Sequence, residues 1–256
     1  MNQGLVVPQS QVLVRARSLL FVPASRPERF AKALGSGADA VILDLEDAVA
    51  PEHKVAARTC ITHVWPQMDV TQWGRLLVRI NPPGTPWHED DLQLIESLPG
   101  LGALMLPKTQ SCEELSFVQS RAPWLPLMPL IETAEGLAQI DRLARAPMVI
   151  RLAFGHLDFQ ADLGMVCGED QTELAPVRLA MVMASRRAGL VPPVDGICTS
   201  TNDQSVVAAD AARSRRMGFT GKLCIHPAQL ESIHQGFSPS AQERDWAERV
   251  LHAHVQ

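Results

Sequence analysis

The chain has 256 residues, a net charge of −5 and 46% hydrophobic residues, which is enough for one large domain with a complete core. A negative charge without a basic run argues against nucleic acid as a partner, and the apolar runs are too short to span a bilayer. The first residues, MNQGLVVPQSQVLVRAR, lack the charged start and the uninterrupted apolar stretch of a signal peptide, so we expect a cytoplasmic protein.

After an N-terminal tail, residues 1–16, one pattern repeats along the chain: a short apolar run, a polar tip and a segment with helical spacing. The expected strands are 18–25, 40–47, 75–81, 103–108, 125–133, 151–158, 194–199 and 222–227. The expected helices are 27–37, 51–65, 90–98, 112–122, 134–147, 174–188, 202–218 and 241–254. Short apolar runs closed by turn residues are typical of buried parallel strands.

Eight such units without a linker or a composition break predict an α/β fold with a single (β/α)8 TIM-barrel domain over residues 17–256. The alternative is a doubly wound open sheet, but no glycine-rich dinucleotide fingerprint follows the first strand. In a barrel the active site lies at the carboxyl ends of the strands, so the residues there are candidate functional residues.

Two neighbouring strands of this pattern each end close to one carboxylate, Glu132 in PLIET and Asp158 in FGHLD. The carboxyl ends of parallel strands meet at one mouth, so both side chains can face one point. Mg²⁺ typically takes one or two protein carboxylates and leaves its other positions to water and substrate. The alternative is structural: Glu132 favoured by a helix dipole and Asp158 as a loop cap.

Further charged residues follow other strands. Arg79 ends VRIN, where an always-charged guanidinium could stabilise a developing enolate or could pair with Glu46 or Asp47. Alternation places Glu46 on the same side of its strand as Asp44, so Glu46 is the better candidate for a site role, and we expect Asp47 to cap the next helix.

Lys108 could form a Schiff base, although neutralising the carboxylates is the favoured role. His226 is expected to be structural. Arg26 and Arg29 flank the start of the first helix, which favours either a phosphate-bearing ligand or a surface salt bridge.

The chain resembles the citrate lyase beta-subunit-like proteins, which belong with the malyl-, citramalyl- and citryl-thioester lyases of the metal-dependent aldolase superfamily. The resemblance rests on SLLFVPASRPERFAKALGSGADAVILDLEDAVAPEHKVAAR, VRIN, LMLPK, PLIET, RLAFGHLD, VDGICT and GFTGKLCIHPAQL, in that order. It covers the chain from Arg17 to Leu251. It implies a (β/α)8 barrel, Mg²⁺, a CoA or acyl-carrier-protein thioester as substrate, and a homotrimer.

The resemblance also assigns roles. Glu132 and Asp158 match the metal ligands, and Arg79 matches the arginine that contacts substrate near the thioester and the keto acid. The catalytic candidates are Arg79, which the resemblance supports, and Glu46, which is favoured by alternation along its strand.

Two ligand-binding segments match as well. Arg26, assisted by Arg29, matches a contact to the nucleotide end of CoA. The backbone amides of Gly155, His156 and Leu157 match the loop that holds the keto acid carboxylate, and Glu132 is also expected to contact substrate.

The implied reaction is carbon–carbon cleavage of a 3-hydroxy-3-carboxy-acyl thioester to a 2-oxo acid and an acetyl thioester, or the reverse Claisen condensation. Many relatives continue past the region where this sequence ends, at Gln256, into a segment that folds over a neighbouring subunit's mouth and supplies an acidic residue. We expect the domain over residues 17–256 to lack that lid.

Three alternatives remain open: an aldolase on free keto acids that needs no contact at Arg26, a Schiff-base aldolase through Lys108, and a weakly active or non-catalytic subunit that needs a partner.

Overall fold

The computed structural model describes residues 11–255, and its strands form a closed parallel barrel in the order β1-β2-β3-β4-β5-β6-β7-β8. The strands are β1 (Ser18–Pro23), β2 (Ala40–Asp44), β3 (Leu76–Arg79), β4 (Ala103–Leu106), β5 (Leu127–Ile131), β6 (Ala153–Phe154), β7 (Val194–Asp195) and β8 (Gly221–Cys224). β8 pairs with β1, where Leu19 lies opposite Leu223, and this pairing closes the barrel. The predicted (β/α)8 fold is confirmed.

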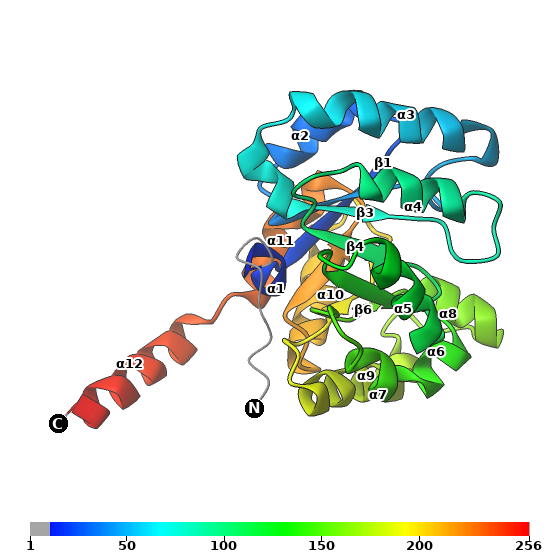
Figure 1. Cartoon of the computed structure of the whole chain (residues 1–256). Coiled ribbons are helices and arrows are strands. Elements are labelled where there is room, and N and C mark those ends of the chain that lie inside the picture. Colours follow the sequence, from blue (N-terminus) through cyan, green and yellow to red (C-terminus); the bar gives the residue numbers. More distant parts are fainter. Residues whose placement is uncertain (1–10, 256) are drawn as a thin grey trace.

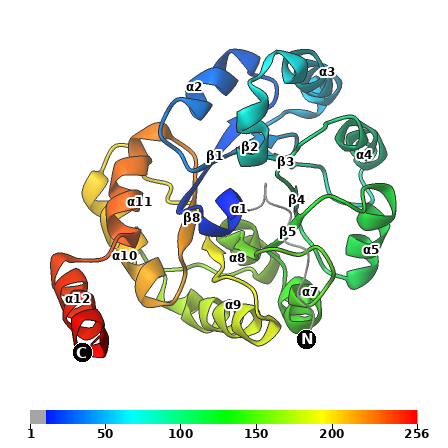
Figure 2. The same cartoon turned by 60° about the vertical axis from the view of Figure 1, so that its left-hand side comes forward.

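Most of the helices surround the strands as an outer ring (Figure 2). The helices of the described residues are α1 (Gln11–Arg15), α2 (Phe30–Leu34), α3 (Lys54–Val64), α4 (His88–Glu96), α5 (Cys112–Arg121), α6 (Ala134–Ala138), α7 (Ile140–Ala144), α8 (His156–Leu163), α9 (Ala175–Ala188), α10 (Gln204–Arg216), α11 (Leu230–Phe237) and α12 (Ala241–Val255). The last helix, α12, projects away from the barrel (Figure 1). None of the described helices is long and apolar enough to cross a membrane.

The core has two layers because side chains alternate along each strand. On β2, Ile42 belongs to the cluster inside the barrel, whereas Val41 and Leu43 belong to the cluster between the strands and the helices. Leu13 of α1 is fully buried and joins the inner cluster. Residues 11–15 of the predicted tail are therefore a helix that packs on the barrel, while residues 1–10 lie outside the described residues.

The main difference from the sequence prediction concerns the strand expected at 151–158. β6 ends at Phe154, and α8 begins at His156 after Gly155. Asp158 therefore lies in the first turn of a helix, where a carboxylate is favoured by the helix dipole. α11 was also not expected from the sequence, and the helix predicted over 134–147 is divided into α6 and α7 at Gln139.

Candidate active site

A cavity of about 350 Å³ opens at the carboxyl ends of the strands. Its polar lining comes from one half of the barrel, with Asp44 on β2, Arg79 on β3, Glu132 after β5 and Asp158 on α8. The structure therefore brings together the expected metal ligands and the expected substrate-binding arginine at one mouth.

Arg79 is held by Asp44, its lateral neighbour in the β2–β3 pairing. Nε and Nη2 of Arg79 donate to the two carboxylate oxygens of Asp44, at 2.7 and 2.6 Å. Nη1 lies 2.9 Å from Oε2 of Glu46, and the guanidinium lies over the ring of Phe21. Burial opposes the charge of Arg79, but the adjacent Asp44 carboxylate raises its pKa, so Arg79 stays charged and rigidly oriented.

The sequence reasoning missed the role of Asp44, although alternation had placed it on the site side of its strand. Besides Arg79, it accepts hydrogen bonds from the backbone N–H groups of Glu46 and Ala48, at 2.9 and 3.0 Å. The expectation that Asp47 caps the next helix is wrong, because Ala50 precedes that helical segment and no side chain caps it. The Asp47 side chain is 59% exposed and lies 3.8 Å from Arg79.

Lys54 is a second residue whose role no sequence motif indicated. It is buried on α3, and its ammonium donates to the carbonyls of Leu45 and Glu46 and to the side chain of Asn81, each at 2.7 Å. These bonds hold the loop that carries Glu46. Only the tertiary contacts reveal this role, because Lys54 and its partners lie in three separate segments.

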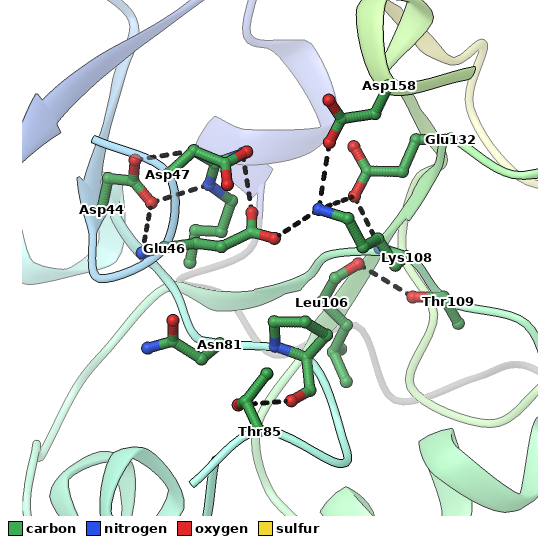
Figure 3. Close-up of polar contacts among 12 residues, drawn as sticks. Asp44, Glu46, Asp47, Asn81, Thr85, Leu106, Lys108, Thr109, Glu132 and Asp158 are labelled. Carbon is green, nitrogen blue, oxygen red and sulfur yellow. Dashed lines mark hydrogen bonds and ion pairs between the residues drawn. The ribbon is translucent and has the colours of Figure 1, made fainter. Parts of the chain in front are cut away.

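Lys108 lies at the centre of the carboxylates. Its ammonium is 2.8 Å from Oε1 of Glu46, 3.0 Å from Oδ2 of Asp158 and 3.9 Å from Oε1 of Glu132 (Figure 3). Burial disfavours the charge, but the hydrogen bond to Glu46 and the surrounding carboxylates raise the pKa of Lys108. A Schiff base requires a neutral amine, so this geometry favours the neutralising role.

Glu132 is almost fully buried, and its Oε1 accepts a 2.6 Å hydrogen bond from the backbone N–H of Lys108. Burial, and then the charge of Glu46, raise the pKa of Glu132 to about 8. A Cβ at Gly155 would collide with the Glu132 carboxylate, so only glycine leaves room for it there.

The donor set fits a hard divalent cation. Glu132 and Asp158 both approach the Lys108 ammonium from neighbouring elements, which places their oxygens around one position of positive charge (Figure 3). Oε2 of Glu46, close by, is buried and lies 2.9 Å from Nη1 of Arg79. Glu132 and Asp158 together supply the one or two protein carboxylates that Mg²⁺ typically takes.

The segment Gly155–Leu157 lines the cavity as expected, but its amides are not equivalent. The N–H of Gly155 donates to the carbonyl of Ile131, whereas His156 and Leu157 start α8, where backbone N–H groups have no intrahelical acceptor. Burial, and then the charge of Lys222, lower the pKa of His156 to about 4, so this imidazole is neutral at pH 7.

Arg26 and Arg29 are exposed and do not line this cavity. Nε of Arg26 donates to Oε1 of Glu28 at 2.7 Å, which is the surface salt bridge of the alternative interpretation. Nδ1 of His226 accepts from the backbone N–H of Ala228, in line with the structural role expected for that histidine.

Residues 17–227 match the family model described as HpcH/HpaI aldolase/citrate lyase. A (3S)-malyl-CoA thioesterase of Cereibacter sphaeroides is 35% identical over 244 residues, which cover 93% of this chain and 82% of that protein. An L-malyl-CoA/beta-methylmalyl-CoA lyase of the same species is 33% identical over 269 residues, with 93% and 83% covered. The crystal structure of CitE from Mycobacterium tuberculosis in complex with magnesium, acetoacetate and coenzyme A has a TM-score of 0.81 and 32% identity, covering 94% of this chain and 88% of that one.

Proposed function

Because this chain belongs to the HpcH/HpaI aldolase/citrate lyase family, we propose that it is a Mg²⁺-dependent carbon–carbon lyase of acyl-CoA type. Its substrate would be a 3-hydroxy-3-carboxy-acyl thioester of the malyl, citramalyl or citryl class, cleaved to a 2-oxo acid and an acetyl thioester. The observation that carries the proposal is the convergence of Glu132, Asp158 and Arg79 at one barrel mouth.

Glu132 and Asp158 would hold the metal, which supplies a Lewis acid that lowers the pKa of the substrate hydroxyl. Arg79 would stabilise the negative charge that develops on the thioester oxygen as the carbon–carbon bond breaks. Its bidentate pairing with Asp44 fixes the guanidinium before the reaction, so little reorganisation is needed. The amides that start α8 would bind the carboxylate of the 2-oxo acid.

Glu46, a catalytic candidate from the sequence, does not line the cavity and lies between Arg79 and Lys108. We therefore assign it a positioning role, in which it orients the two cations. Burial raises the pKa of Glu46, and the contact with Arg79 opposes that shift.

The thioester would be carried by CoA, with Arg26 and Arg29 at the nucleotide end, and an acyl carrier protein is the alternative carrier. Both arginines are exposed at the end of β1 and accessible to a phosphate. We also propose a homotrimer, which analytical ultracentrifugation would test.

A second candidate is thioester hydrolysis, because the relative at 35% identity is named a malyl-CoA thioesterase. The products distinguish the two activities. A lyase releases a 2-oxo acid and an acetyl thioester, whereas a thioesterase releases free CoA thiol and a hydroxy acid. Both products should be followed with malyl-CoA, citramalyl-CoA and citryl-CoA, with and without Mg²⁺.

The test of the site is the pair of variants Glu132→Ala and Asp158→Ala. Each should abolish Mg²⁺ binding in calorimetry and magnesium-dependent turnover while leaving the circular dichroism unchanged, because the mouth residues contribute little to the core. Asp141→Ala, which removes an exposed partner of Arg187 on the outside of the barrel, is the control. Unchanged magnesium affinity in both site variants would contradict the assignment.

A further inference from the structure

We infer that the 2-oxo acid half of the substrate carries one carboxylate and an apolar substituent. The reason is that the β7–β8–β1 side of the cavity presents apolar side chains and no accessible cation within the described residues. This inference rests on the proposed function and deepens it, since that function leaves the malyl, citramalyl and citryl classes open.

The cavity has two unlike halves. The residues on the β2 to β6 side include the carboxylates and Arg79, as described above. The side formed by β7, β8 and β1 contributes Ile197, Leu223, Ile225 and Phe21. These four side chains have no group that could form an ion pair with, or donate a hydrogen bond to, a carboxylate.

The cations nearest to this apolar side point away from the cavity. Lys222 precedes Leu223 on β8, and alternation places its side chain on the outside of the barrel, where Nζ lies 2.7 Å from Asp210. Arg178 of α9 donates from Nε to both carboxylate oxygens of Asp195, at 3.1 Å. Both cations are almost fully buried behind the strands, and neither lines the cavity.

The cations on the other side are already paired. Arg79 is bound by Asp44 and lies beside Glu46, and Lys108 is bound by Glu46 and Asp158. A substrate carboxylate would therefore find no cation there that lacks a carboxylate partner.

The charge of the whole lining leads to the same conclusion. Four carboxylates and one guanidinium line the cavity: Asp44, Asp47, Glu132, Asp158 and Arg79. With a bound Mg²⁺ ion holding Glu132 ionised, and with the adjacent Glu46 and Lys108 included, negative charge still exceeds positive charge after the two charges of the metal are added. One substrate carboxylate can bind the metal and the amides of α8.

Arg79 is the cation that lines the cavity, and the proposed function places the thioester oxygen on it. A second carboxylate of the 2-oxo acid would therefore face either apolar side chains or like charges, and burying it without a partner is unfavourable. A methyl or larger alkyl group at the same place has no charge to desolvate, and its transfer from water to the apolar side of the cavity is favourable in free energy. The substrate class that fits is thus a thioester whose cleavage yields a 2-oxo monocarboxylate of the pyruvate kind, and a 2-oxo dicarboxylate fits poorly.

The test is calorimetric binding of three 2-oxo acids to the full chain at saturating Mg²⁺: pyruvate, oxaloacetate and 4-methyl-2-oxopentanoate. The last has the same number of non-hydrogen atoms as oxaloacetate but an isopropyl group in place of the second carboxylate, so it separates charge from size. Oxaloacetate must be freshly dissolved and its decarboxylation followed by NMR. Both monocarboxylates should bind at least about tenfold more tightly than oxaloacetate, a difference that calorimetry resolves.

A matched pair of variants tests whether the apolar side of the cavity causes the discrimination against oxaloacetate. Ile197 is partly exposed in the cavity, so Ile197→Lys adds a cation there, and Ile197→Met adds a chain of similar length without the charge. We expect the ratio of oxaloacetate affinity to pyruvate affinity to be about tenfold or more higher in the lysine variant than in the methionine variant.

The other outcomes would contradict either the inference about the substrate or the proposed function. Oxaloacetate binding as tightly as pyruvate would overturn the inference alone, and so would equal weakness of oxaloacetate and 4-methyl-2-oxopentanoate, because size would then explain the selection. An unchanged ratio of oxaloacetate to pyruvate affinity in a folded, pyruvate-binding Ile197→Lys protein would also overturn it. No magnesium-dependent binding of any 2-oxo acid would refute the proposed function, and the inference with it.

Discussion

Lys108 adopts a left-handed backbone conformation, with φ of 48°, which is unusual for a residue with a long side chain. In this conformation both its backbone N–H and its ammonium reach the metal-site carboxylates: the N–H donates to Glu132, and the ammonium donates to Asp158 and Glu46. A cation that binds between Glu132 and Asp158 therefore competes with this ammonium for the same oxygens.

Lys108→Met should consequently bind Mg²⁺ more tightly than the wild type, by roughly tenfold. Lys108→Arg retains the charge and is the matched control, with an affinity expected to stay close to that of the wild type. Calorimetric titration with MgCl₂ measures both. Weaker magnesium binding in the methionine variant would mean that Lys108 organises the carboxylates more than it competes for them.

His156 should make the stability of the protein depend on pH. Burial lowers its pKa to about 4, below the ordinary value of 6.5. At a pH between these two values, the histidine is protonated in the unfolded chain and neutral in the folded protein. The contribution of the neutral His156 imidazole to the free energy of unfolding is therefore complete above about pH 6.5. This contribution decreases by on the order of 3 kcal/mol as the pH drops toward 4.

His156→Gln removes this titration, so its free energy of unfolding in urea should change less between about pH 7 and pH 4.5 than that of the wild type. His252→Gln, a change on exposed helix α12, should leave the pH dependence as it is. Equal pH dependence in the wild type and in both variants would rule out the buried imidazole as its source.

At the scale of elements, α1 closes the amino-terminal end of the barrel and lies in the middle of the ring of strands (Figure 2). Arg151 is fully buried there, and its Nη1 donates to the carbonyls of Leu13 and Ala16, at 3.2 and 2.6 Å. Its Nε donates to the carbonyl of Pro192 at 2.7 Å. The arginine thus joins the N-terminal helix to the segment before β7.

The side chain of Leu13 is the apolar part of this closure, with no exposed surface. Leu13→Ala should lower the free energy of unfolding by about 2–5 kcal/mol because it leaves a cavity under the barrel. Val12→Ala, at a neighbouring side chain that is 43% exposed, should change it by less than about 0.5 kcal/mol. Urea denaturation compares them, and similar effects of the two changes would mean that α1 is not part of the cooperative core.

For the molecule as a whole, the barrel is weakest in backbone pairing where its shortest strands meet. β6 and β7 have two residues each, and they share a single paired position, Ala153 with Val194. Directly behind them lie the buried ion pairs of Asp195 with Arg178 and of Lys222 with Asp210. Helices α9 and α10 are thereby bound to β7 and β8 through charges.

Breaking one such pair should cost more than replacing both partners. Lys222→Met leaves Asp210 with only the partly exposed Arg213 as its ion-pair partner. It should destabilise the protein by about 3 kcal/mol, the lower end of the range for a broken buried pair. In the double variant Lys222→Met/Asp210→Leu, most of that loss should be recovered, because no uncompensated carboxylate remains. A double-mutant cycle in urea measures the coupling between the two residues, and purely additive effects would contradict it.

The sequence by itself determined the fold class, the family and the residue types at the mouth. Eight buried runs followed by helical segments are a local signal, and parallel strands buried on both faces show it clearly. The carboxylates after β5 and β6 and the arginine after β3 could be placed at one mouth because all parallel strands end at the same side. The neutralising role favoured for Lys108 followed from the same reasoning.

Only the tertiary structure decided how these residues are paired. The bidentate contact of Asp44 with Arg79 depends on the lateral register of two strands, and the bonds of Lys54 join segments far apart in the sequence. Gly155, directly before α8, packs against the Glu132 carboxylate, so the close approach of these two segments is likewise a tertiary contact. The apolar side of the cavity also depends on the orientation of the Lys222 and Leu223 side chains. The ion pairs and the side-chain orientations both arise from contacts between segments that are distant in the sequence.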